Sequence, residues 1–154
     1  MALVRFIAAR FSPKSILNSI WGSKSPEDPR HRLGRLGERL AARFLRRSGY
    51  KILYRNVRAQ HGGEVDLICR DRDQDILAFV EVKTRTSDEL ARPADAVNLE
   101  KEALICRGAR AWLRMLDRPD IVFRFDIVEV VMGEGKPRFN LLKSAFQLPE
   151  ERRR

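Results

Sequence analysis

Two carboxylates and an amine lie in neighbouring apolar segments, in a pattern that suits chemistry on phosphate esters. The segment Glu64 to Arg70 contains Asp66, and the segment that starts with Ile76 to Val82 supplies Glu81, with Lys83 two residues later. Side chains of a β-strand share a face at every second residue, so Glu81 and Lys83 are expected on one face. An acid from each of two strands could hold a divalent cation, while the amine places positive charge beside a phosphate.

A β-hairpin would bring the two acids together. The polar segment Arg72 to Asp75 is typical of a turn, and the runs on either side have the residue types of strands. With these four residues as the loop, Asp71 pairs with Ile76, and the same antiparallel register places Asp66 opposite Glu81. Opposed carboxylates repel each other, and a bound Mg²⁺ or Mn²⁺ would explain the presence of both.

A Glu-x-Lys triplet by itself is usually a surface ion pair, and that alternative has to be weighed. Here the triplet follows the apolar residues Ala78 to Val80, and an aspartate is expected across the hairpin. These two features favour the catalytic interpretation.

The composition predicts one folded domain with a strongly basic surface. The chain has 154 residues, of which 44% are hydrophobic, which is enough for a real core. The formal net charge is +10, and 24 of the 31 basic residues are arginine. Because the guanidinium fork matches phosphate oxygens, nucleic acid is the first partner to consider, and a solvated basic surface is the alternative.

Periodicity predicts two helices and five strands in an α/β arrangement. The first helix is expected over Leu33 to Arg47, and the second over Leu99 to Leu116. The strands flanking the hairpin are expected at Tyr50 to Val57, at Ile121 to Met132 as an inner strand, and at Arg138 to Leu142 as an edge strand.

These patterns also predict which side chains share a face in the first helix and in the first strand of the hairpin. The apolar stripe of the first helix is expected to comprise Leu33, Leu36, Leu40 and Phe44, with Ala41 and Leu45 widening it. In the first hairpin strand, Val65, Leu67 and Cys69 are expected on one face and Asp66 on the other.

Glu38 lies at the border of the apolar arc of the first helix, away from most of the arginines and facing the edge of the sheet. It could supply a third ligand to a metal or a water molecule, or it could pair with Arg35 or Arg39. The sequence leaves both alternatives open. The neighbouring Gly34 and Gly37 leave room for close approach of another backbone.

The residues GRLGERLAARFLRRSGYKILYRNVR, GGEVDLICRD, FVEVKTR and RFDIVEV resemble the bacterial YraN-like family of uncharacterised proteins over residues 33 to 146. That family is related to archaeal Holliday-junction resolvases and to the PD-(D/E)xK restriction-endonuclease-like superfamily. The resemblance implies an αβββαβ core with a mixed central sheet flanked by helices. It also implies a metal-dependent endonuclease with Glu38, Asp66, Glu81 and Lys83 as catalytic residues, the three acids being the metal ligands.

The expected substrate is nucleic acid, DNA more than RNA, with branched DNA as one candidate. We expect phosphate contacts from basic residues near the site, with solvated surface positions as the alternative for each: Arg35, Arg39, Arg58, Arg85 and Lys101. Resolvase relatives act as symmetric dimers, which leaves a homodimer open. A non-catalytic nucleic-acid-binding module on a nuclease fold is the alternative function.

The two ends of the chain differ in composition from the middle. Residues 1 to 30 are expected to form a flexible basic arm, or alternatively an amphipathic helix for a membrane surface or partner, residues 31 to 148 the endonuclease-like domain, and residues 149 to 154 a charged tail. No apolar run is long enough to span a membrane. Cys69 and Cys106 lack metal-ligand spacing and are expected to be buried thiols in a reducing compartment, the cytoplasm.

Overall fold

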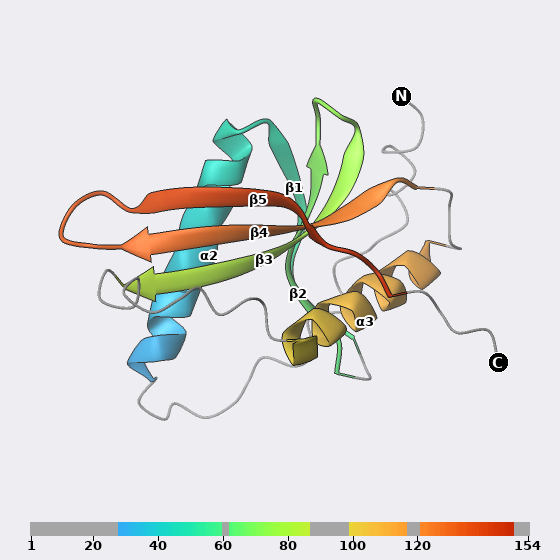
Figure 1. The fold of residues 1–154 in the computed structure, drawn as a ribbon, viewed down its shortest axis with the longest axis horizontal. Helices are drawn as coiled ribbons and strands as arrows, with labels where there is room; N and C mark the ends of the chain where they lie inside the picture. The colour runs from blue at the N-terminus through green and yellow to red at the C-terminus, as the bar shows by residue number, and fades with distance from the viewer. Residues whose placement is uncertain (1–27, 60–61, 87–98, 117–120, 150–154) are drawn as a thin grey trace.

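Within the described residues, a five-stranded mixed sheet forms the centre, and one helix packs on each of its faces (Figure 1). The computed structural model describes residues 28–59, 62–86, 99–116 and 121–149. The elements in chain order are α2 (Pro29–Arg47), β1 (Tyr50–Arg58), β2 (Glu64–Asp71), β3 (Ile76–Thr86), α3 (Leu99–Met115), β4 (Phe123–Met132) and β5 (Arg138–Phe146). The predicted α/β class and the predicted order of elements are confirmed.

The strands follow one another across the sheet in the order β1-β2-β3-β4-β5. Only β3 and β4 pair in parallel, and α3 lies in the crossover between them, as a parallel pair requires. The predicted inner position of β4 and edge position of β5 are confirmed. β5 extends beyond the predicted Leu142 because Phe146 pairs with Phe125 and the two rings stack.

The helix α2 begins at Pro29, earlier than the predicted Leu33. Asp28 caps it, since its side chain accepts a hydrogen bond from the Arg30 amide at 2.9 Å. An aspartate followed by proline is a favoured helix start, because the aspartate accepts from a free amide and the proline needs no acceptor. The prediction missed this signal, and residues 29 and 30 belong to the helix. Residues 1–27 and 150–154 of the expected arm and tail lie outside the described residues.

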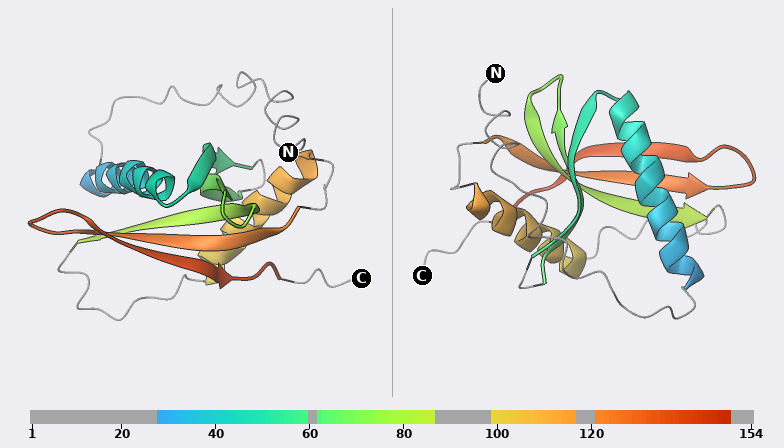
Figure 2. Two further views of the ribbon diagram at one scale, coloured as in Figure 1. Left: turned by 90° about the horizontal axis from the view of Figure 1, so that it is seen from above. Right: turned by 180° about the vertical axis from the view of Figure 1, so that it is seen from behind.

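The face that α2 buries matches the predicted stripe in part, because Ala41 and Leu45 are buried and Leu40 and Phe44 pack against the same core. Its buried residues are Gly37, Ala41, Ala42 and Leu45, whereas Leu36 is 39% exposed. Small residues allow the helix to approach the sheet closely: a Cβ atom added at Gly37 would lie 1.7 Å from Thr84 Oγ1 on β3. Gly37 therefore packs closely, but against the side chain of Thr84 and not against the predicted backbone, while Gly34 has nothing within 4 Å of such an atom. Figure 2 shows α2 lying across one face of the sheet.

Two hydrophobic clusters fill the two faces of the sheet. Leu77 and Phe79 of β3 join the cluster beneath α3, while Ala78 and Val80 join the cluster beneath α2, as regular alternation requires. The hairpin has the predicted register, with Asp71 paired with Ile76.

The face predicted for β2 is wrong at Val65. This side chain packs in the cluster beneath α3, whereas Leu67 and Cys69 pack in the cluster beneath α2. The change of side occurs between Val65 and Leu67, next to the last pair of β2 with β3, Leu67 with Val80. At the start of β2, a Cβ atom at Gly63 would lie 2.4 Å from the Gly108 nitrogen, so this glycine lets β2 contact the backbone of α3.

Cys69 and Cys106 are buried free thiols, as predicted. Among the described residues, no helix is long and apolar enough to cross a membrane.

Candidate active site

The strands β2 and β3 part at the acidic pair that the sequence predicts. Their paired positions follow the predicted register and end at Leu67 with Val80. One step further, this register brings Asp66 opposite Glu81, and their carboxyl groups lie within hydrogen-bonding contact. The Val82 amide donates a hydrogen bond to Asp66 Oδ2 at 2.8 Å. Where the two strands separate, the Asp66 carboxylate therefore accepts a hydrogen bond from the backbone of β3.

Burial and like charge dominate the electrostatics of this pair. Glu81 is only 6% exposed, and burial, followed by the charge of Asp66, raises its pKa to about 8. Burial also raises the pKa of Asp66, although the Val82 amide and the charge of Lys101 oppose that effect. The Oε2 atom of Glu81 is buried and has no hydrogen-bond partner within the described part of the chain. Such a pair must be neutralised by a shared proton or by a cation.

Lys101, in the first turn of α3, supplies one positive charge to the acids. Its ammonium group forms an ion pair with Glu64 and lies 3.4 Å from Glu81 Oε1. Burial lowers the pKa of Lys101, but the hydrogen bond to Glu64 and the charges of Glu81 and Asp66 outweigh it and give a raised pKa. Lys101 is therefore a charged, half-buried partner of the acidic pair and not the solvated surface lysine of the alternative prediction.

Glu38 reaches the site from α2, on the other face of the sheet. It hydrogen-bonds Asn56 of β1, an edge strand, so the prediction that it faces the sheet edge is confirmed. Burial and the charge of Asp66 raise its pKa, and Arg35 and Arg55 act in the opposite direction. Glu38 also lines a pocket together with Arg35 and Arg39, so its predicted separation from the arginines is wrong.

Asn56 is a residue of the site that the sequence analysis missed. The pairs Arg55 with Leu67 and Val57 with Val65 place it directly across from Asp66. Its φ of 50° lies in the left-handed region, which a residue inside a strand rarely adopts and which is common at functional sites. An asparagine within a strand-forming run was the available signal, because asparagine tolerates this conformation better than most residues.

Lys83 lies two residues after Glu81 on β3 and is half-buried. The alternation of β3 places it on the face of Glu81, as predicted. Within residues 28–59, 62–86, 99–116 and 121–149, no three His, Cys, Asp or Glu side chains are arranged to hold a metal ion. The three predicted ligands are thus not gathered as one set, and Glu38 hydrogen-bonds Asn56. The donors that fit a cation are Asp66 and Glu81, with the unpartnered Oε2 atom.

The remaining basic candidates lie near acids of their own. Arg58 pairs across the strands with Glu64, whose pKa it helps to lower after the larger effect of the Lys101 hydrogen bond. Arg85 lies with its Nε atom 3.9 Å from Glu129 Oε1. Their contact with nucleic acid stays a prediction.

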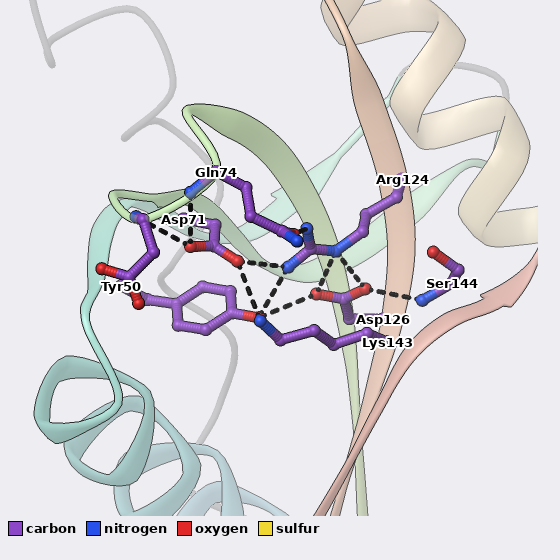
Figure 3. Close-up of polar contacts among 8 residues, drawn as sticks. Tyr50, Asp71, Gln74, Arg124, Asp126, Lys143 and Ser144 are labelled. Atoms are coloured by element: carbon purple, nitrogen blue, oxygen red, sulfur yellow. Dashed lines mark hydrogen bonds and ion pairs between the residues drawn. The ribbon is translucent and has the colours of Figure 1, made fainter.

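A second polar cluster lies at the other end of the β2–β3 hairpin (Figure 3). Arg124 donates to Asp126 at 2.8 Å and to Asp71 at 2.6 Å, and both acids are almost fully buried. Lys143 lies 3.1 Å from Asp71, and the Tyr50 hydroxyl donates to Asp126 at 3.3 Å. Each acid has several donors, so this cluster joins β1, β2, β4 and β5 and has the character of a structural network. The sequence analysis missed it.

The fold and the site together define an α/β protein with a nuclease-like core: a helix, an antiparallel three-stranded unit, a crossover helix and a fourth strand, with an acidic pair on the second and third strands. Residues 37–130 match the family described as uncharacterised protein family UPF0102, and the chain belongs to that family.

Curated relatives agree with this assignment. A UPF0102 protein of Trichlorobacter lovleyi is 42% identical over 117 residues, which cover 75% of this chain and 91% of the relative. A UPF0102 protein of Nocardia farcinica is 47% identical over 115 residues, covering 74% of this chain and 88% of the relative. The family resemblance expected from the sequence is confirmed.

Proposed function

We propose that this protein hydrolyses phosphodiester bonds of nucleic acid with the help of a divalent cation. One observation carries the proposal: Asp66 and Glu81 are carboxyl groups in contact, and the buried Oε2 of Glu81 has no partner among the described residues. Burying two acids side by side is costly unless their charge is neutralised, so a protein gains nothing from this pair in packing alone. Lys83, two residues after Glu81 on the same strand, adds the positive charge that stabilises a reacting phosphate.

Each residue of the site has a distinct task in this proposal. Asp66 and Glu81 would hold Mg²⁺ or Mn²⁺, both of which prefer carboxylate oxygens. When bound, such a cation polarises a phosphoryl oxygen and makes water a better nucleophile. Lys83 places its ammonium group beside the scissile phosphate or its attacking water, and Lys101 fixes Glu81 Oε1. Glu38 offers a carboxylate near Asp66 that orients water.

The proposed substrate is nucleic acid, DNA in preference to RNA, with branched DNA as a candidate. The net charge of +10 supports a polyanionic partner. A homodimer would place two such sites on the two strands of one substrate.

The test is cleavage of a panel of labelled linear, flapped, branched and single-stranded nucleic acids with Mg²⁺ or Mn²⁺. Asp66→Asn should abolish cleavage and weaken cation binding, because a neutral amide replaces an anionic oxygen ligand. Asp73→Asn, in the exposed hairpin turn, is its matched control and should behave as wild type.

Lys83→Ala separates catalysis from binding. It should lower turnover by about a hundredfold while cation binding and substrate affinity change little, because the ammonium group acts in the transition state. Lys136→Ala, at an exposed turn, is the control. Equal turnover of Lys83→Ala and wild type would remove Lys83 from the catalytic set.

A non-catalytic binding module is the second candidate. The observation in its favour is the Lys101 ammonium group, which partly neutralises the acids without a metal. Tight binding of nucleic acid without cleavage of any substrate in the panel, unaffected by Asp66→Asn, would support this candidate and refute the hydrolase.

A further inference from the structure

A pocket lies between α2 and β1, and one of its lining residues, Glu38, experiences the charge of Asp66. Its volume is about 120 Å³, and the residues that line it are Arg35, Glu38, Arg39, Arg55, Asn56 and Leu67. By this measure one water molecule needs about 10–15 Å³, so the space is large enough for a group of the size of phosphate. The pocket is therefore suited in size to a small polar group.

The charge of the lining selects an anion. Three guanidinium groups and one carboxylate give the lining a formal charge of +2. Arg35 and Arg39 lie one turn apart on α2, so their side chains project from the same side of the helix, and Arg55 reaches the pocket from β1. Guanidinium groups that converge from two elements match the oxygens of a phosphate in both charge and geometry.

Glu38 connects this pocket to the acidic pair. It is part of the lining, its side chain bonds Asn56, and the charge of Asp66 acts on it directly. Asn56 lies across from Asp66 in the sheet. A nucleic-acid strand whose reacting phosphate lies at Asp66 can therefore place a neighbouring phosphate among the arginines.

We propose that the pocket binds a phosphodiester group of the nucleic-acid strand, next to the one that is cut, and so positions the strand on the acidic pair. The statement that the neighbouring phosphodiester is cut rests on the proposed function, whereas binding of a phosphodiester in the pocket does not. The arginines carry their own charge, so the pocket needs no cation, whereas Asp66 and Glu81 repel a phosphate unless they are neutralised. Binding of a nucleic-acid strand in the presence of EDTA should therefore depend on the arginines of the pocket.

The experiment compares Arg55→Gln with Arg43→Gln in EDTA. Both side chains are exposed and both substitutions remove one charge, but Arg43 does not line the pocket. Arg55→Gln should weaken binding of a labelled oligonucleotide about tenfold, and should reduce the slope of log affinity against log salt by about 0.7 for a single strand or about 0.9 for a duplex. Arg43→Gln should change affinity less than about threefold.

A scan with methylphosphonate linkages identifies the phosphate. Neutralising one linkage at a time should reveal a position that weakens binding to wild type and to Arg43→Gln but has no effect on Arg55→Gln. Indistinguishable behaviour of the two variants, absence of such a position, or absence of binding at low salt would each overturn the proposal.

A second experiment measures the binding of inorganic phosphate to wild type and to Arg55→Gln. If it binds wild type but not Arg55→Gln while no linkage in the scan is sensitive, the pocket takes free phosphate and the strand assignment is wrong. If the scan succeeds but no substrate is ever cleaved, the pocket stands and the hydrolase proposal fails.

Discussion

Replacing Glu81 by glutamine should make the protein more stable at alkaline pH. The side chain is 6% exposed, and its pKa is raised to about 8 by burial and by Asp66. In the unfolded chain this carboxyl returns to an ordinary pKa near 4.5. Between these two values the folded protein holds a proton that the unfolded chain has released. The free energy of unfolding therefore falls as pH rises from about 5 towards 8, and levels off above it.

The size of the effect follows from the difference between the two pKa values. They differ by about 3.5, and each pKa unit corresponds to about 1.4 kcal/mol, so ionising Glu81 in the folded protein costs at most about 5 kcal/mol. The attraction of Lys101 is already included in the pKa of about 8. Glutamine has nearly the same shape and cannot ionise, so Glu81→Gln should match wild type near pH 5 and exceed it by several kcal/mol near pH 9.

Urea unfolding in EDTA at several pH values between 5 and 9 measures this difference. Glu134→Gln is the matched control, because Glu134 lies exposed in the turn between β4 and β5 and its substitution should leave the pH dependence unchanged. A wild-type stability that is flat or rising over this range, or a constant difference between Glu81→Gln and wild type, would refute the burial and contact assigned to the acidic pair.

Three further substitutions test other parts of the structure. Arg124→Met should lower the free energy of unfolding by about 3–5 kcal/mol in urea titration, because Asp71 and Asp126 would stay buried without their main donor; Arg72→Met, in the exposed turn, should change it by less than about 0.5 kcal/mol. Gly63→Ala should cost about 1–3 kcal/mol in the same assay, since the added methyl group meets the Gly108 backbone, whereas Gly135→Ala has open space. In Lys101→Met the free energy of unfolding should level off at a higher pH than in wild type, because the ammonium group that favours ionised Glu81 is gone. The same pH in both proteins would contradict the contact between Lys101 and Glu81.

The hairpin at the centre of the site could be predicted because local sequence determines it. A four-residue polar loop sets the pairing of the two strands, and one residue of slip would move every apolar side chain to the other face. Only one register of the two strands is therefore consistent with the sequence, and it places Asp66 opposite Glu81. The inner position of β4 followed from the high content of strand-forming residues in the segment Ile121 to Met132.

Features that depend on tertiary contacts could not be predicted. Periodicity ranked Leu36 above Gly37 as a buried position, yet the close approach of α2 to Thr84 favours the glycine. Asn56, the partner of Glu38, has a left-handed backbone conformation inside β1, which no hydrophobic pattern encodes. The Arg124 network joins residues far apart in the chain, so no local pattern connects its members.

In the proposed function, the two sides of the site act on a polyanion in different ways. Asp66 and Glu81 form an acidic centre that repels a phosphate until a cation neutralises it, whereas the arginines beside Glu38 attract one at all times. In this proposal, a nucleic-acid strand held by the arginine pocket would bring its neighbouring phosphate to the acids, so contacts remote from the reacting bond would supply the free energy of positioning. Affinity should then follow Arg55 and salt, while turnover should follow Asp66, Lys83 and the cation. Substitutions that changed both quantities together at every position would show that the pocket and the acidic pair are not separate parts of one site.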